Sequence, residues 1–229
     1  MSAPRRRELA NLAQRYGFWV IEDDPYGELW FDRRPPDPVA SHSPNVIRLS
    51  STSKILAPAL RVGWMVAPDA VCRGVELLKQ GADLCGSALT QQIAAELLAD
   101  TEWLAVHVDR VRLAYGERAA GLLSALRERL DGRVRGTAVT GGMFLWAECV
   151  GDVDGVPIDT EALLARALEH GVAFVPGSAF AVGAGHRSSM RLCFATFEVA
   201  TLREAVDRLG RALDDVASDS GGRSIAANR

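Results

Sequence analysis

A short run of hydroxyl residues ends in a lysine and is followed by an arginine, between two apolar segments. Residues 50–53 are Ser-Ser-Thr-Ser, Lys54 comes next, and Arg61 follows seven residues later. Hydroxyls and a guanidinium can hold a phosphate, and a lysine beside them can form a Schiff base with an aldehyde. A serine-rich loop with a solvated lysine is the simpler interpretation, and this motif alone favours it. The rest of the chain must decide between the two.

A second polar group follows an apolar segment earlier in the chain. Residues 18–21 form a continuous apolar run typical of a strand covered on both faces, and Glu22, Asp23 and Asp24 follow directly. Ligands of open α/β sheets bind beyond the carboxyl ends of the strands. Acids buried there need a cationic partner, because an unpaired buried charge is costly. A polar turn is the alternative interpretation, since proline and glycine come next.

The elements that would position these groups alternate between helix and strand. Apolar spacing in the first part predicts helices over 4–16, 70–80, 89–99 and 102–130, and strands over 18–21, 45–49 and 62–67. The second part predicts strands over 133–139, 143–149, 172–175 and 190–195, with helices over 160–170 and 201–217. This pattern indicates an α/β domain followed by a small α+β domain. We place the boundary in the long helix, giving domains 1–110 and 111–217, and expect residues 218–229 to be a disordered tail.

The composition excludes several classes of protein. The 229 residues are 48% hydrophobic and 24% charged with a net charge of −3, which does not predict a nucleic-acid surface. The four cysteines are scattered without metal-ligand spacing, so we expect reduced thiols and no metal site. Neither a membrane-spanning run nor an apolar signal segment is evident, and we expect a cytoplasmic protein. Lys54 and Lys79 are the only lysines, so a catalytic lysine has one competitor.

Four motifs occur in one order along the chain: Asp23-Asp24-Pro25-Tyr26, Ser51-Thr52-Ser53-Lys54 with Arg61, residues 141–146 (Gly-Gly-Met-Phe-Leu-Trp), and Arg191. In this order the chain resembles the class I/II aminotransferases, fold-type I enzymes that use pyridoxal 5′-phosphate. It is most similar to the branch of 2-aminoadipate and aromatic aminotransferases and of MocR-type transcription regulators. The resemblance implies an α/β fold, namely the C-terminal part of the large domain with an incomplete, mostly parallel sheet, plus a smaller α+β domain.

The resemblance also implies a role for each matching residue. Lys54 would carry the cofactor as a Schiff base and then shuttle the proton of the substrate Cα. Asp23 would pair with the protonated pyridine nitrogen and so keep the ring an electron sink. Tyr26 would hydrogen-bond the phenolic oxygen of the ring.

The remaining matching residues would bind anions. Ser51, Ser53 and Arg61 would hold the cofactor phosphate, with Ser51 the firmer of the two serines. Arg191 would clamp the α-carboxylate of the substrate, although without the resemblance a rim arginine in a strand is the simpler interpretation. The substrates would be an amino acid and a 2-oxo acid. The identity of the amino acid does not follow from the sequence.

One departure from the family pattern concerns the start of the chain. In this family a long N-terminal part precedes the segment that resembles residue 1 onward, and it supplies a glycine-rich phosphate cup, a ring that stacks on the cofactor and the first strands of the sheet. We therefore expect an N-terminally truncated member, whose full-length form would be a homodimer. Two alternatives stay open: a cofactor-binding effector domain of a MocR-like regulator without productive turnover, and an inactive remnant.

Overall fold

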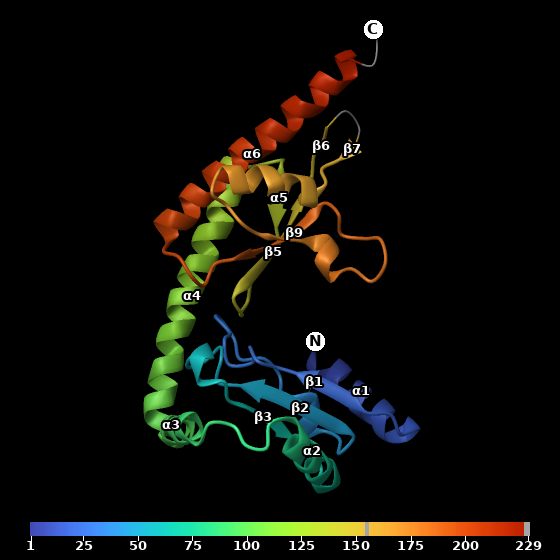
Figure 1. The fold of residues 1–229 in the computed structure, drawn as a ribbon, viewed down its shortest axis with the longest axis vertical. Coiled ribbons are helices and arrows are strands. Elements are labelled where there is room, and N and C mark those ends of the chain that lie inside the picture. The colour runs from blue at the N-terminus through green and yellow to red at the C-terminus, as the bar shows by residue number, and fades with distance from the viewer. Residues whose placement is uncertain (154–155, 227–229) are drawn as a thin grey trace. The chain divides into compact units, whose positions relative to one another are not determined.

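The structure is a computed structural model that describes residues 1–153 and 156–226 (Figure 1). The chain divides into two compact units, unit 1 from Met1 to Arg112 and unit 2 from Leu113 to Arg229. The sequence had placed this boundary after residue 110, in the same long helix. Each unit is described by itself below.

Unit 1 begins with a helix that stops at a glycine. Helix α1 (Ala3–Tyr16) ends at Gly17, whose φ of 71° is the left-handed conformation that only glycine adopts without strain. The unit then contains β1 (Val20–Asp23), η1 (Val39–Ser41), β2 (Val46–Ser51), η2 (Pro58–Leu60), β3 (Gly63–Val66), α2 (Asp69–Ala82), α3 (Ala88–Ala99) and the start of α4 (Thr101–Arg129). Every helix and strand predicted for this part is present, with ends that differ by at most two residues.

The three strands of unit 1 form one sheet in the order β1-β2-β3. Strand β1 pairs parallel to β2, with Val20 opposite Val46, whereas β3 runs antiparallel to β2, with Gly63 opposite Ser51. The sheet therefore has one parallel and one antiparallel pairing, whereas the resemblance implied a mostly parallel sheet. Residues 52–62 join β2 to β3 without a crossover helix, and such a short connection favours the antiparallel direction.

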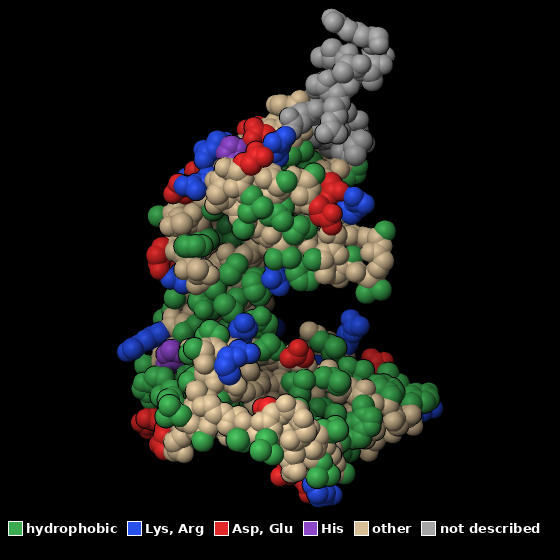
Figure 2. Space-filling model, in the orientation of Figure 1, with side chains coloured by type: hydrophobic (Ala, Val, Ile, Leu, Met, Phe, Trp, Pro, Cys, Tyr) green, Lys and Arg blue, Asp and Glu red, His purple; other side chains and the backbone are tan. Residues whose placement is uncertain are grey.

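The apolar run before the acids is covered on one face only, which corrects the prediction of a strand buried on both faces. The inner face packs in a core of Ala10, Val39 and Val46, against which Val20 also lies. Side chains alternate along a strand, so Ile21 lies on the opposite face and is 67% exposed. Val66 on β3 is 57% exposed. Figure 2 shows hydrophobic side chains on the surface over α1 and β1.

Unit 2 is built on an antiparallel sheet in the order β4-β5-β9-β8. Its elements after α4 are β4 (Val134–Gly136), β5 (Phe144–Cys149), β6 (Asp152–Val153), β7 (Val156–Pro157), α5 (Thr160–Glu169), β8 (Val175–Pro176), η3 (Gly177–Phe180), β9 (Ser189–Cys193) and α6 (Val199–Ala226). The β6–β7 hairpin was not predicted, and β8 is shorter than the predicted strand. The other strands and helices of this part match their predicted places.

Alternation along β5 separates the core of unit 2 from an open face. Leu145 and Ala147 are buried, as are Met190 and Leu192 on β9, while Phe144 and its neighbours on the other face are only partly buried. Helix α5 packs against α6 in the same unit. Helix α6 reaches Ala226, beyond the predicted end at 217. The disorder predicted for 218–229 stays a prediction, because 227–229 and the side chains from 219 onward lie outside the described residues.

Candidate active site

The predicted lysine lies in a tight loop that leaves the carboxyl end of β2 and returns to β3. Thr52 closes the base of this loop, because its backbone N–H and its hydroxyl both donate to the carbonyl of Val62, at 3.0 and 3.1 Å. The Thr52 side chain is fully buried, which fixes the point where the loop begins. The N–H of Leu56 donates to the carbonyl of Thr52 at 2.8 Å and forms a turn around Lys54.

Lys54 and Tyr26 lie close together although 28 residues separate them in the sequence. The Lys54 Nζ is 5.9 Å from the centroid of the Tyr26 ring, and both residues are partly buried. Their proximity follows from the parallel pairing of β1 with β2, which opens both carboxyl ends at one edge of the sheet. Ser50 strengthens this edge, since its hydroxyl donates to the carbonyl of Asp24 at 3.2 Å.

The three acids after β1 have three different environments. Glu22 accepts the backbone N–H groups of Val39 and Ala40 at 3.0 and 3.1 Å, and it pairs with Arg6 at 3.0 Å. Asp24 pairs with Arg48 at 2.9 Å. Asp23 is exposed, and its side chain makes no hydrogen bond or ion pair with any residue that the structure describes. Asp23 is therefore the one acid of the three whose carboxylate stays available to a cation from outside the described chain.

The predicted phosphate ligands surround the same loop. The Ser51 hydroxyl accepts the N–H of Ser53 at 3.2 Å, so these two serines form a compact turn directly before Lys54. Arg61 has a φ of 54°, a left-handed conformation uncommon for residues other than glycine, and it caps η2 two residues before β3 begins at Gly63. Its side chain is exposed and donates to the carbonyl of Pro58 at 3.2 Å. Two hydroxyls therefore precede the lysine and a guanidinium follows it.

A histidine that the sequence did not single out supports this loop. His107 on α4 donates from Nε2 to the carbonyl of Ile55 at 2.9 Å, and Ile55 follows Lys54 directly. The Trp103 ring stacks on His107 with 5.0 Å between ring centroids and 3° between the planes, which fixes the orientation of the imidazole. Because 52 residues separate the two partners, no local pattern in the sequence could have revealed the contact.

Arg191 belongs to unit 2, whereas the other predicted site residues lie in unit 1. It lies on β9, opposite Trp146 of β5 and opposite Val175 of β8. Its Cζ is 4.0 Å from the centroid of the Phe144 ring, so the guanidinium lies over an aromatic face. The Nε of Arg191 is buried without a hydrogen-bond partner among the described residues. The Gly141–Gly142 turn before β5 includes Gly142 at a φ of 80°.

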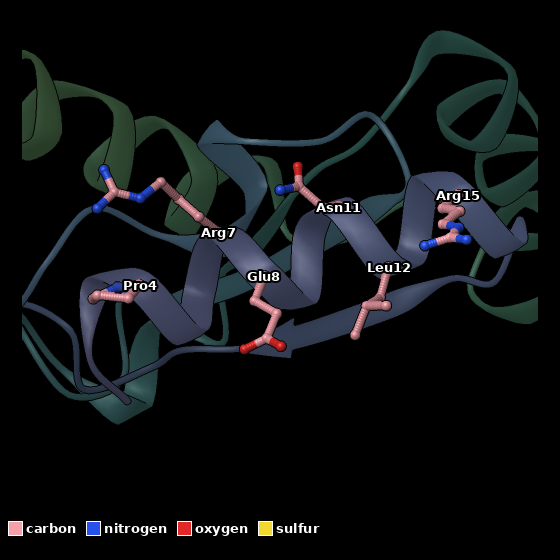
Figure 3. A pocket seen from close by; sticks show the side chains of 6 residues that line it. All are labelled: Pro4, Arg7, Glu8, Asn11, Leu12 and Arg15. Carbon is pink, nitrogen blue, oxygen red and sulfur yellow. The ribbon is translucent and has the colours of Figure 1, made fainter.

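Three other kinds of site were considered among the described residues: a metal site, a membrane-spanning helix and a surface pocket. No three His, Cys, Asp or Glu side chains within 1–153 and 156–226 lie together as metal ligands would. None of the helices described there is long and apolar enough to cross a membrane. A depression on the surface runs along α1 and is lined by Pro4, Arg7, Glu8, Asn11, Leu12 and Arg15 (Figure 3). Figure 3 shows Arg7 and Glu8 pointing apart, so its polar groups do not converge on one ligand.

Comparison with known proteins matches this arrangement to one family. The family of class I and II aminotransferases matches residues 1–209. A 2-aminoadipate transaminase of Thermus thermophilus is 41% identical over 92% of this chain and 52% of its own length. An uncharacterized HTH-type transcriptional regulator of Bacillus subtilis is 32% identical over 95% of this chain and 44% of its own.

A solved structure has the same fold as the chain. The alpha-aminoadipate aminotransferase LysN of Thermus thermophilus, in complex with N-(5′-phosphopyridoxyl)-L-leucine, superposes with a TM-score of 0.84 at 37% identity. The match covers 94% of this chain and 55% of LysN, and the chain spans about half the length of the curated relatives it matches. The fold is thus that of part of a fold-type I enzyme. The chain belongs to the family of class I and II aminotransferases.

Proposed function

We propose that this chain carries the lysine part of an aminotransferase that uses pyridoxal 5′-phosphate and moves an amino group between an amino acid and a 2-oxo acid. The observation that carries the proposal is the end of β2 and the loop after it, where a half-buried lysine, two serines and an arginine follow the sheet edge at which β1 ends in Asp23, an acid whose side chain has no partner among the described residues. Family membership and the phosphopyridoxyl compound bound to the solved relative support the choice of cofactor.

The residues present fit this cofactor by charge and by position. The cofactor carries a phosphate, a carbonyl that condenses with amines, and a pyridine nitrogen that acts as an electron sink when protonated. Ser51, Ser53 and Arg61 would hold the phosphate through hydroxyl and charge-assisted hydrogen bonds. Asp23 would hold the proton on the pyridine nitrogen, because its carboxylate has no partner among the described residues to compete for it.

Lys54 and Tyr26 would carry out the proton chemistry. Lys54 would bind the cofactor between turnovers and then, as a free amine, remove the proton from Cα of the amino acid. The Tyr26 ring lies 5.9 Å from the Lys54 Nζ, near enough for its hydroxyl to contact the same cofactor. Lys79 is unsuited to this role because it is exposed and paired with Asp83 four residues later.

Arg191 would bind the α-carboxylate of the substrate. Its buried Nε has no hydrogen-bond partner among the residues described, and a carboxylate matches the planar pair of donors of a guanidinium. This assignment selects 2-amino and 2-oxo acids as a class and leaves the side chain of the substrate open.

The assembly that would work in the cell is also part of the proposal. We propose a homodimer of the full-length protein, because Ile21 and Val66 leave an apolar surface that covering elements would stabilise. We also propose that it works in the cytoplasm. A second candidate function has its own support. The HTH-type transcriptional regulator among the relatives favours the effector domain of such a regulator. In that role the chain would bind the cofactor without productive turnover, and an inactive remnant is the third candidate.

Reduction with borohydride tests the cofactor assignment. The chain is incubated with pyridoxal 5′-phosphate and reduced, and the modified lysine is mapped by mass spectrometry. We expect the phosphopyridoxyl group on Lys54, with Lys54→Arg unmodified and the matched control Lys79→Arg labelled like the parent. Folded parent protein without label on Lys54 would exclude both the enzyme and the effector domain. An amino acid that changes the absorbance of the bound cofactor would then favour the enzyme.

A further inference from the structure

Arg191 lies between side chains that come from both sides of its strand. Strand β9 is an inner strand of the sheet, with β5 on one side and β8 on the other. Phe144 comes from β5, and Phe180 comes from η3, the segment that directly follows β8. The Arg191 Cζ is 4.0 Å from the centroid of the first ring and 4.9 Å from that of the second. The guanidinium therefore has two aromatic neighbours, and its buried Nε has no hydrogen-bond partner among the described residues.

Phe180 covers Arg191 from the β8 side of the strand. Its ring also contacts Trp146 on β5, with 5.6 Å between centroids and an interplanar angle of 74°. A side chain that starts beyond β8 and contacts β5 must cross over β9, and Arg191 is the β9 residue opposite Trp146. The ring is nevertheless 45% exposed, so burial alone does not account for its position. His186 contacts the same Trp146 ring at 5.6 Å.

The backbone holds η3 in the place that this contact requires. A Cβ added to Gly177 would lie 2.4 Å from the carbonyl oxygen of His186 and 2.8 Å from the Cβ of Ser189. Glycine therefore lets η3 approach the start of β9 more closely than any other residue could. The hydroxyl of Ser178 donates to Glu161 of α5 at 2.6 Å and ties the segment from the other side. Phe180 thus extends from a fixed support.

We propose that Phe180 is a positioning residue for Arg191, an inference that rests on the proposed role of Arg191 in binding the substrate carboxylate. The two rings would hold the guanidinium plane by cation–π contact without using any of its donors. The donors along its edge would stay free to bind a planar carboxylate at two points. A hydrogen-bonded partner could hold the plane equally well, but it would compete with the substrate for these donors.

The experiment follows the Arg191 side chain by NMR in the ¹⁵N-labelled 229-residue chain, without the cofactor. The Arg191 Nε–Hε signal is identified by its absence in Arg191→Lys, and 2-oxobutanoate is titrated as the probe. Phe180→Leu removes the ring and keeps an apolar side chain, while Phe180→Tyr keeps the ring. Val182→Ala is the matched control, because this fully exposed residue lies two residues after Phe180, outside η3.

Support for the proposal consists of three results together. The Arg191 proton resonates upfield in the parent because of the ring currents, and this shift is reduced in Phe180→Leu. The Kd for the probe rises about 3- to 10-fold in Phe180→Leu, the size of a partly exposed cation–π contact. Phe180→Tyr and Val182→Ala stay within about twofold of the parent, a difference of about 0.4 kcal/mol.

The outcomes that overturn the proposal are separable from failure of the proposed function. If Arg191→Lys loses the probe while Phe180→Leu keeps it, the role of Phe180 is wrong and the carboxylate site stands. If Arg191 gives no response to the probe, or if Arg191→Lys binds it as tightly as the parent, the carboxylate role itself is wrong. Should Phe180→Leu fail to fold, an Arg191 proton without an upfield shift in the parent would still overturn the proposal.

Discussion

The three consecutive acids after β1 allow a direct test of which residues support the fold and which serve chemistry. Glu22 accepts two backbone N–H groups of η1 and pairs with Arg6, and its side chain is only 12% exposed. In Glu22→Gln one of the two N–H groups would face an amide donor, and Arg6 would lose its charged partner. An unsatisfied, partly buried donor costs about 1–3 kcal/mol, so we expect the free energy of unfolding to fall by about 2–3 kcal/mol.

The two neighbouring acids are the matched controls. Asp24→Asn removes the ion pair with Arg48, whose side chains are 28% and 29% exposed, and we expect a loss of about 0.5–1 kcal/mol. Asp23→Asn removes a charge that has no partner among the described residues, and we expect a change within about 0.5 kcal/mol. The loss of stability should therefore rank Glu22 first, Asp24 second and Asp23 last.

Equilibrium unfolding in urea, followed by tryptophan fluorescence, measures these changes. Four of the five tryptophans, at positions 19, 30, 64 and 103, lie in unit 1 and report its unfolding. Cofactor binding, followed by absorbance, should reverse the ranking, with Asp23→Asn showing the greatest loss. An Asp23→Asn variant as unstable as Glu22→Gln would mean that Asp23 supports the fold, which would refute the division of the three acids.

Three further predictions concern other residues. Burial would raise the pKa of Asp159, but hydrogen bonds from an arginine and a backbone N–H outweigh it, so the pKa lies below its usual value. As the pH falls, the unfolded chain therefore binds the proton at a higher pH than the folded chain does, and the stability that the charged Asp159 contributes is lost. Thermal unfolding between pH 2 and 4 should show a smaller fall in Tm in Asp159→Asn than in the parent. Burial raises the pKa of the Cys149 thiol to about 11, so mass spectrometry should find iodoacetamide at pH 8 on the exposed Cys85 well before Cys149. His107→Ala should destabilise the lysine loop by about 1 kcal/mol in urea and speed its hydrogen exchange, whereas His107→Gln, which keeps a donor, should lose less.

Much of the fold could be predicted because its signals are local. Hydrophobic periodicity and Gly17 define α1, and apolar runs define β1, β2 and β3 within two residues. The antiparallel direction of β3 was not predicted. It depends on the connection between β2 and β3, residues 52–62, which is too short to hold the crossover helix that a parallel strand would need. The exposure of Ile21 was not predicted. An apolar run indicates that a strand has faces to bury, but it does not indicate whether another part of the chain packs on each face.

The candidate site could be predicted only in part, for the same reason. Lys54 and Arg61 lie in one loop, and their spacing is visible in the sequence. The partners of Glu22 and Asp24 lie in other elements, so the sequence could not distinguish these acids from Asp23. His107 contacts the loop across 52 residues, and Phe180 meets Arg191 through the packing of η3. Contacts of this kind depend on tertiary structure and leave no local signal.

The parallel pairing of β1 and β2 is what turns separate motifs into one candidate site. Asp23 lies opposite Leu49, so its carboxylate and the loop that follows Ser51 leave the sheet at the same edge. Antiparallel strands would place these two groups at opposite ends, about 3.3 Å apart for each residue of strand length. The antiparallel return of β3 then places Arg61 back at that edge, because Gly63 lies opposite Ser51. A substitution that shifts the β1–β2 register would therefore separate Asp23 from Lys54 while leaving both side chains intact.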